Sequence, residues 1–239
     1  MAAPTTRDSI LRAALDCFIT DGFERTTTAR IRERSGVSNG ALFHHFKTKE
    51  DIADALFVDA MVSYQQGLWE IVRRKPRSLR AAVRAAIGHQ LGWVEDHPDL
   101  ARFVYMRGHL DWSTPAGAQV EALNRDLAGA FTGWMAPLVE RGEIRPMSML
   151  TVSAIVSGPA HAVARRWLAG HTEVKPREFT DELADAAWAG LRGRPVSARR
   201  RAPAGPRRGR VSLELVNSEG TVVAAGEATA ELEPVANAG

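Results

Sequence analysis

The sequence predicts an all-α protein, because apolar residues recur at steps of three and four over residues 7–192 and no sustained alternation of apolar and polar residues interrupts them. The chain has 239 residues, of which 45% are apolar and 25% charged. This composition is ordinary for a globular protein and allows a sizeable buried core. The single cysteine, Cys17, excludes an internal disulfide framework and a cysteine-built zinc site.

The first part of the chain predicts one longer helix and two short ones. A stripe of apolar residues marks a helix that stops near Asp21. Thr27 or Thr28 can cap a short helix that ends at Gly36, where a left-handed residue is favoured. Ser38 can cap the second short helix. Two short helices that are joined by a tight glycine turn and braced by a preceding helix form a helix-turn-helix.

The rest of the body predicts longer helices that are delimited by caps, prolines and glycines. Pro115 after Thr114 occupies a first helical position, where its missing N–H costs nothing. Pro137 predicts a kink near a helix end, and Gly158-Pro159 predicts a bend. The expected helices run from Thr48 to Pro76, from Ser78 to His97-Pro98, from Thr114 to Gly142, and over residues 149–169 and 177–191.

The composition changes after residue 193. Residues 195–210 hold six arginines, three prolines and no acid, which predicts a linker or disordered tail. Alternating Val211, Leu213 and Leu215 make residues 211–233 compatible with a hairpin, although disorder is the favoured interpretation. The arginines of this tail either stay solvated or add nonspecific phosphate contacts.

The second short helix carries chemistry suited to a DNA groove. Its first turn, Asn39-Gly40-Ala41, is small, so the backbone can approach a major groove while the Asn39 amide hydrogen-bonds adenine. Helix N-termini present N–H groups to phosphate, and Lys47 and Lys49 add cations. Short helices around a glycine turn also occur in proteins that never bind DNA, so the wider order of residues has to decide.

That order covers residues 7–60 and combines aromatic, threonine, glycine and lysine positions. They are Phe18, Gly22-Phe23, Thr26-Thr27, Ile31, Gly36-Val37-Ser38, Leu42-Phe43, His45-Phe46 and Lys49-Glu50. The pattern resembles the N-terminal signature of the tetracycline-repressor (TetR) family of bacterial transcriptional regulators.

The resemblance implies three parts: a helix-turn-helix DNA-binding domain over residues 4–64, a larger helical effector-binding and dimerisation domain over residues 65–193, and the Arg/Pro-rich tail over residues 194–239. By this resemblance, the residues that contact phosphates or position the helices are Thr27, Phe43, His45 and Lys49, and those that face bases are Thr28, Ala29, Asn39, Gly40, Ala41 and His44. The DNA-binding candidates are Thr27, Thr28, Ala29, Arg30, Ser38, Asn39, Gly40, Ala41, Phe43, His44, His45, Lys47 and Lys49.

Three positions depart from the family pattern. Phe43 replaces a usual tyrosine, so a hydroxyl that could bind phosphate is missing. Arg32 stands where alanine is common, and Ala29 lacks the long side chain that some members use in the groove. Asn39 and His44 are therefore the main candidates for direct readout of bases.

Reading two half-sites requires a dimer, because two recognition helices must lie about 34 to 36 Å apart to meet successive major grooves. The helices over residues 149–169 and 177–191 are strongly apolar, and the first is apolar on more than one face, which favours burial by a partner. The alternative is a central helix within one protomer. The interface candidates are Leu150, Ile155, Val163, Trp167, Leu183 and Trp188.

Aromatic and methionine residues on the middle helices suit an adaptable apolar cavity for a small-molecule effector. For any one of them an ordinary aromatic core is the favoured alternative, and His161 can be a hydrogen-bonded core residue. The pocket candidates are Trp69, Trp93, Phe103, Met106, Trp112, Phe131, Trp134, Met135 and His161.

No motif indicates catalysis or a cofactor. The histidines lack metal-ligand spacing, and the sequence contains no glycine-rich phosphate loop or nucleophile elbow. The charged start and the absence of a membrane-spanning run predict a cytoplasmic protein without a membrane partner. We therefore expect a non-enzymatic, ligand-responsive repressor that binds double-stranded operator DNA as a homodimer and answers to an apolar effector. The alternative is a helical small-molecule-binding protein or enzyme that does not use its helix-turn-helix.

Overall fold

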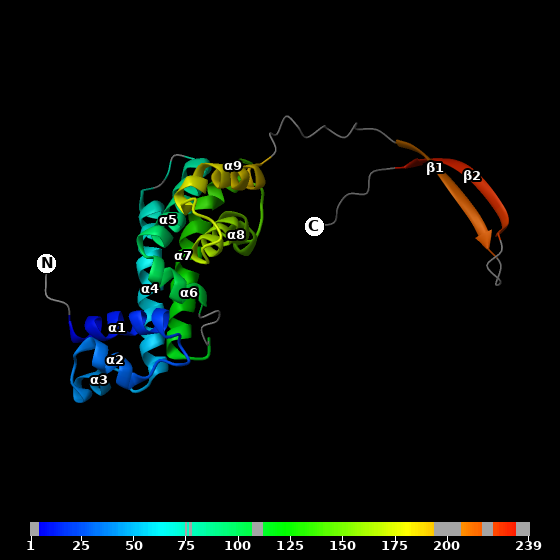
Figure 1. Ribbon diagram of the computed structural model, residues 1–239. Helices are drawn as coiled ribbons and strands as arrows, with labels where there is room; N and C mark the ends of the chain where they lie inside the picture. Colours follow the sequence, from blue (N-terminus) through cyan, green and yellow to red (C-terminus); the bar gives the residue numbers. More distant parts are fainter. Residues whose placement is uncertain are drawn as a thin grey trace. The chain divides into compact units, whose positions relative to one another are not determined.

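The computed structural model describes residues 5–74, 76, 78–106, 112–193, 207–216 and 222–232. The chain divides into two units, residues 1–194 and residues 195–239. In the first unit, the described residues form helices and turns with one isolated backbone bridge between Ile144 and Arg192 (Figure 1). This architecture confirms the all-α prediction for the body of the protein.

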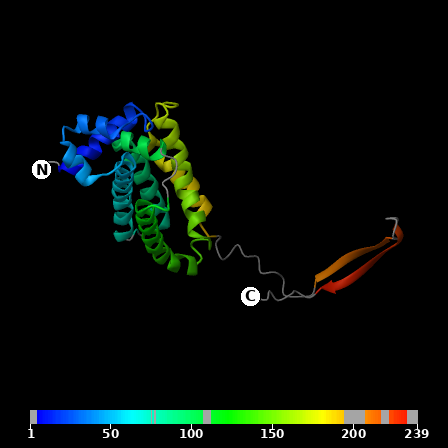
Figure 2. The same ribbon diagram turned by 90° about the horizontal axis from the view of Figure 1, so that it is seen from below.

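Three helices form an N-terminal head at one end of the first unit (Figures 1 and 2). They are α1 (Thr6–Thr20), α2 (Thr28–Ser35) and α3 (Asn39–His45). A side-chain cap fixes the start of each, namely Thr5, Thr27 and Ser38. The head shares one buried cluster with the body, which includes Ile10, Leu11, Ala14, Phe18, Ile31, Leu42, Phe46, Ile52 and Phe103.

The body consists of longer helices around a second core. They are α4 (Lys49–Arg73), α5 (Leu79–Asp96), α6 (Pro98–Met106), α7 (Pro115–Glu140), α8 (Met149–Leu168), the 3₁₀ helix η1 (Pro176–Phe179) and α9 (Thr180–Leu191). Helix α4 starts at a capping box of Thr48 and Asp51 and packs against α1, α5 and α7, so it joins the head to the body.

Helix α5 shows why the body folds as the pattern predicts. Its residues Leu79, Val83, Ile87 and Leu91 recur at every fourth position and are all buried against α7, α8 and α9. Burying each such aliphatic side chain stabilises the fold by about 1.5 to 3 kcal/mol. The four residues therefore form a continuous apolar stripe along the buried face of α5.

The structure differs from the sequence prediction in two helical details. The sequence does not predict helix α6, which begins at Pro98 directly after the turn at His97, because a proline is tolerated at the first helical position. The expected helix over residues 177–191 begins as η1 and becomes α-helical at Thr180. Pro137 and Pro159 lie inside the continuous helices α7 and α8, as the sequence predicts.

The second unit contains an antiparallel pair of strands, β1 (Arg207–Val216) and β2 (Val222–Leu232). Over these residues the favoured expectation of a disordered tail is wrong, and the less favoured hairpin is what forms. The register pairs Val211 with Ala228 and Leu213 with Gly226.

Candidate nucleic-acid interface and ligand cavity

Local hydrogen bonds build the turn between α2 and α3. Thr27 Oγ1 accepts the Arg30 N–H at 3.2 Å, and Ser38 Oγ accepts the Ala41 N–H at 3.1 Å. Gly36 ends α2 in the left-handed region at φ 69°, and its N–H donates to the Arg32 carbonyl at 3.1 Å. A left-handed residue is cheapest as glycine, so the sequence fixes the turn. Thr27, and not Thr28, is the cap of α2.

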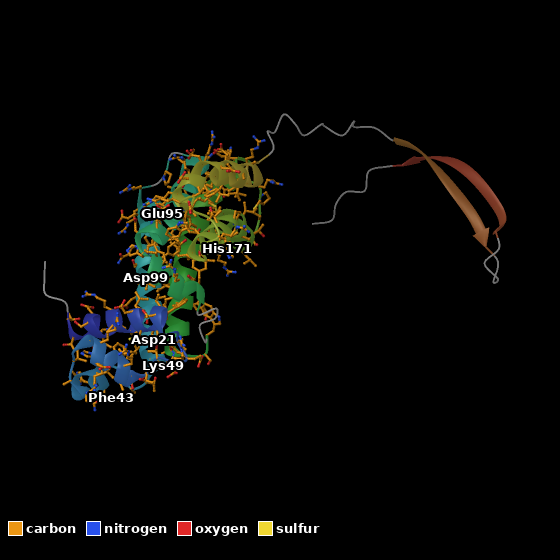
Figure 3. The ribbon with its side chains drawn as sticks, in the orientation of Figure 1. Asp21, Phe43, Lys49, Glu95, Asp99 and His171 are labelled. Carbon is orange, nitrogen blue, oxygen red and sulfur yellow. The ribbon has the colours of Figure 1, made fainter. Side chains whose placement is uncertain are left out.

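One residue in each short helix anchors it to the core. Ile31 of α2 and Leu42 of α3 are both 0% exposed. Most of the remaining residues of α3 face solvent, and Phe43 lies at the tip of the head (Figure 3). Among the DNA-binding candidates, Thr28, Ala41 and Lys49 are half-buried and the exposed ones are Thr27, Ala29, Arg30, Ser38, Asn39, Gly40, Phe43, His44, His45 and Lys47.

The cations around this surface already have partners within the protein. Arg30 forms ion pairs with Glu33 at 3.3 Å and with Asp21 at 3.6 Å. The hydrogen bond that Arg30 donates to Glu33, followed by the negative charge of Asp21, raises the pKa of Arg30. Lys47 Nζ donates to the Phe43 carbonyl at 2.8 Å, but its side chain is exposed and can exchange this contact for a phosphate.

Lys49 occupies a different position from Lys47. Its Nζ donates to the Phe23 carbonyl at 2.8 Å and to the Glu24 carbonyl at 3.4 Å, and it lies 4.4 Å from the centroid of the Phe23 ring. Lys49 therefore fastens the first residue of α4 to the loop between α1 and α2. The structure favours the helix-positioning role for Lys49 over the phosphate-contacting one.

A cavity of about 450 Å³ lies within the body, between α4, α5, α7 and α8 and next to Leu191 of α9. Its walls are mainly apolar, a composition typical of sites for small organic molecules. Four predicted pocket residues line it: Phe131, Trp134, Met135 and His161.

The other predicted pocket residues lie elsewhere. Phe103 is buried in the core of the head, where it stacks on Phe18 with ring centroids 5.6 Å apart. Trp93 is buried beside a second, polar cavity of about 700 Å³, and Trp112 is exposed. Trp69 is half-buried outside both cavities. The side chain of Met106 is outside the described residues.

Sequence analysis missed the wall that α4 contributes. Met61, Tyr64, Gln65 and Leu68 line the cavity from this helix. Their spacing of three, four and seven places them on one helical face, which is the signal that could have identified them. The predicted pocket residues were mainly large aromatic side chains, so these four residues of α4 were not among them.

Two polar pairs stand at the cavity wall. Gln65 is 3% exposed, and its Nε2 donates to Asn124 Oδ1 at 2.7 Å, whereas its Oε1 is buried without a hydrogen-bond partner.

The second pair joins Tyr105 to His161. Tyr105 Oη lies 2.5 Å from Nδ1 of His161. Burial raises the pKa of Tyr105 to about 12 and lowers the pKa of His161, so the pair is neutral, with the tyrosine hydroxyl donating to the imidazole.

The predicted interface residues lie on α8 and α9. Leu150 is 81% exposed and stands at the cavity wall. The remaining five are half-buried, with Ile155, Val163, Leu183 and Trp188 against the main body core and Trp167 against a smaller cluster. Their burial within one chain leaves the dimer a prediction.

Two further findings bear on the class of the protein. No helix among the described residues combines the length and the hydropathy needed to traverse a lipid bilayer. Within the same residues, no group of three or more His, Cys, Asp or Glu side chains is arranged to hold a metal ion.

Comparison with known proteins singles out the head. Residues 10–56 match the family described as bacterial regulatory proteins, tetR family. The HTH-type transcriptional repressor AcnR of Corynebacterium glutamicum is 40% identical over 73 residues, which make up 28% of this chain and 39% of that protein. This chain thus spans about two fifths of the length of that relative, and the match to it is short.

Solved structures extend the likeness to the body. A TetR family transcription regulator from Marinobacter aquaeolei superposes with a TM-score of 0.65 at 22% identity, covering 79% of this chain and 96% of that one. The transcriptional regulator FadR from Bacillus subtilis, solved in complex with stearoyl-CoA, gives a TM-score of 0.65 at 15% identity over 76% and 97% of the two chains. At such identities the shared property is the fold.

Proposed function

We propose that the protein is a transcriptional repressor that binds operator DNA as a homodimer and releases it when a small molecule occupies the body cavity. The proposal proceeds from the match of residues 10–56 to the tetR family of bacterial regulatory proteins. The observation that carries the proposal is the shape of α3. It is held by one buried residue, Leu42, while Asn39, Gly40 and His44 stay exposed on a small first turn. Such a helix can enter a major groove without a change in its packing.

The role of each exposed residue follows from its chemistry. The Asn39 amide is suited to adenine, and Gly40 lets the backbone approach the base edges. Thr27 and Ser38 lie at the N-termini of α2 and α3, where N–H groups and the positive end of the helix dipole favour phosphate. Lys47 is the cation best placed to add a further phosphate contact because it is exposed.

Dimerisation rests on the apolar residues of α8 and α9. A repressor of this kind needs two heads, since one α3 contacts too few bases for useful affinity. Exposed Leu150 would then be covered by the partner chain. An effector in the cavity can weaken DNA binding only if it binds more tightly to a conformation in which the two heads no longer match the groove spacing.

The DNA-binding part of the proposal is tested by selecting genomic fragments with the purified full-length protein and measuring their affinity. We expect one recurrent, twofold-symmetric sequence. Asn39→Ala should cost about 1 to 3 kcal/mol at one base step only. Failure to enrich any fragment, together with a monomeric mass in solution, would contradict the proposal.

A further inference from the structure

The walls of the body cavity carry no charge. Among the described residues that line it, none is Asp, Glu, Lys or Arg, and the polar side chains are those of Tyr64, Gln65, Asn124, Ser153, Ser157 and His161. A carboxylate or phosphate placed inside would lose its hydration without gaining a counter-charge. The cavity therefore selects against anions.

One wall residue has an unused hydrogen-bonding atom. Gln65 is 3% exposed, its Nε2 is committed to Asn124 Oδ1 at 2.7 Å, and its Oε1 is buried with no partner in the described structure. Buried polar atoms are almost always paired in native proteins. A buried, unpaired oxygen on a residue that lines a cavity is a candidate acceptor for a ligand donor, because the ligand would displace no existing partner.

Gln65 also lies among apolar neighbours. Met61 and Leu68 flank it on the same face of α4, and Leu127 and Phe131 stand on α7. A ligand that reaches Gln65 therefore needs a largely apolar skeleton that carries a polar group at this point. Since Oε1 is an acceptor only, that group has to be a donor.

We propose that the cavity binds a neutral, largely apolar molecule whose hydroxyl or N–H group donates a hydrogen bond to Gln65 Oε1. This inference deepens the proposed function, since it names the chemical class of the effector. Both the absence of wall charge and the unpaired oxygen support it, and they are independent observations.

Three probes with one skeleton test the proposal: 1-decanol, decyl methyl ether and decanoate, each titrated into the full-length protein by calorimetry. We expect 1-decanol to bind about tenfold more tightly than the ether, because only the alcohol can donate a hydrogen bond to the otherwise unpaired oxygen of Gln65. Decanoate should bind most weakly, because it would bury a charge. Equal affinities for alcohol and ether, tightest binding of decanoate, or no binding by any probe would overturn the proposal.

Two variants assign the effect to Gln65. Gln65→Leu should bring the alcohol-to-ether ratio to within about twofold, since it removes the acceptor and keeps the bulk. Ser153→Ala, which changes another polar wall residue, should keep the wild-type ratio. A persistent preference for alcohol in Gln65→Leu would refute the role of Gln65. The comparison of probes on the wild type decides the matter if that variant does not fold.

The outcome is separable from that of the proposed function. Retention of genomic DNA is measured on the same protein without any probe. Loss of the alcohol preference with DNA binding intact overturns only the ligand class. Absence of DNA binding with the alcohol preference intact overturns the repressor proposal and leaves the ligand class standing.

Discussion

The helix-turn-helix and the body cavity of this protein are formed in different ways. In the head, residues close in the sequence form the surface, and one buried side chain in each short helix, Ile31 or Leu42, holds it. In the body, the cavity walls come from four long helices, α4, α5, α7 and α8, with Leu191 added by α9, so they are spread over residues 61–191. The folding of each short helix of the head therefore depends on one buried side chain, whereas the shape of the cavity depends on how closely the long helices pack against one another.

The strongest test of this contrast removes an anchor. Leu42→Ala deletes the only fully buried side chain of α3, and such a truncation costs about 2 to 5 kcal/mol of unfolding free energy. We expect DNA binding to be lost while the cavity still binds 1-decanol. Urea unfolding, DNA retention and calorimetry measure the three quantities.

The neighbouring residue supplies the control for the anchor. Phe43 is 38% exposed, so Phe43→Ala should change the unfolding free energy by less than about 1 kcal/mol. If Phe43→Ala destabilised the protein as much as Leu42→Ala, α3 would not depend on one anchor.

The same contrast explains what the sequence could predict. The caps Thr27 and Ser38 and the turn glycine Gly36 act on residues within four positions. The pattern therefore identifies Ser38 and Gly36 directly and leaves only Thr27 or Thr28 as the cap of α2. Only four of the nine pocket candidates line the cavity, because wall membership depends on contacts between distant segments such as Gln65 and Asn124. No local pattern encodes such a pairing.

Lys49 shows the same limit where α4 joins the head to the body. Its charge and its place after α3 indicated a possible phosphate contact. Its carbonyl partner at Phe23 is 26 residues earlier in the chain, and only the fold brings the two together. A pattern of charges cannot distinguish a lysine that faces DNA from one that fastens two segments of the protein.

Helix fit in the body is tested next, at Gly67. A Cβ atom at this position would lie 2.1 Å from Cε1 of His89, whose Nε2 lies 2.7 Å from the Tyr64 carbonyl and whose ring stacks on the Tyr64 ring. Gly67→Ala should therefore cost about 1 to 3 kcal/mol of unfolding free energy. Thermal and urea unfolding provide the measurement.

A second glycine in a long helix makes the matched control. A Cβ atom at Gly133 of α7 meets nothing within 4 Å, so Gly133→Ala should stabilise the helix by about 0.5 to 1 kcal/mol. Adding His89→Ala to Gly67→Ala should recover part of the loss, because the clash partner is gone. If Gly67→Ala alone stabilised the protein, the space between Gly67 of α4 and His89 of α5 would be large enough for a methyl group.

The two lysines after α3 sharpen the comparison at smaller energies. Lys49→Ala should lower the unfolding free energy by about 1 to 2 kcal/mol through loss of the bond to Phe23, without changing the salt dependence of DNA binding. Lys47→Ala should leave stability within about 0.5 kcal/mol and reduce the salt slope by about 0.9, the value for one lost phosphate contact. The reverse pattern in unfolding and salt titrations would return Lys49 to the DNA surface.

The smallest expected effect is a pH dependence that belongs to the cavity and not to the head. Burial, with a lesser effect of the Arg165 charge, lowers the pKa of His161 from its ordinary value of 6.5. As the pH falls through 6.5 the unfolded chain takes up a proton that folded His161 still excludes, so the unfolded state binds more protons and stability declines. His161→Asn keeps an oxygen that can accept from Tyr105 but cannot titrate, and it should lose less stability than the wild type between pH 7.5 and 5.5. The difference between the two proteins should be small, because His161 as a whole residue is exposed and solvent weakens the effect of its pKa shift on stability. The other histidines are present in both proteins, so their contributions cancel. Equal losses in urea unfolding series at the two pH values would mean that the Tyr105–His161 pair does not keep the imidazole neutral.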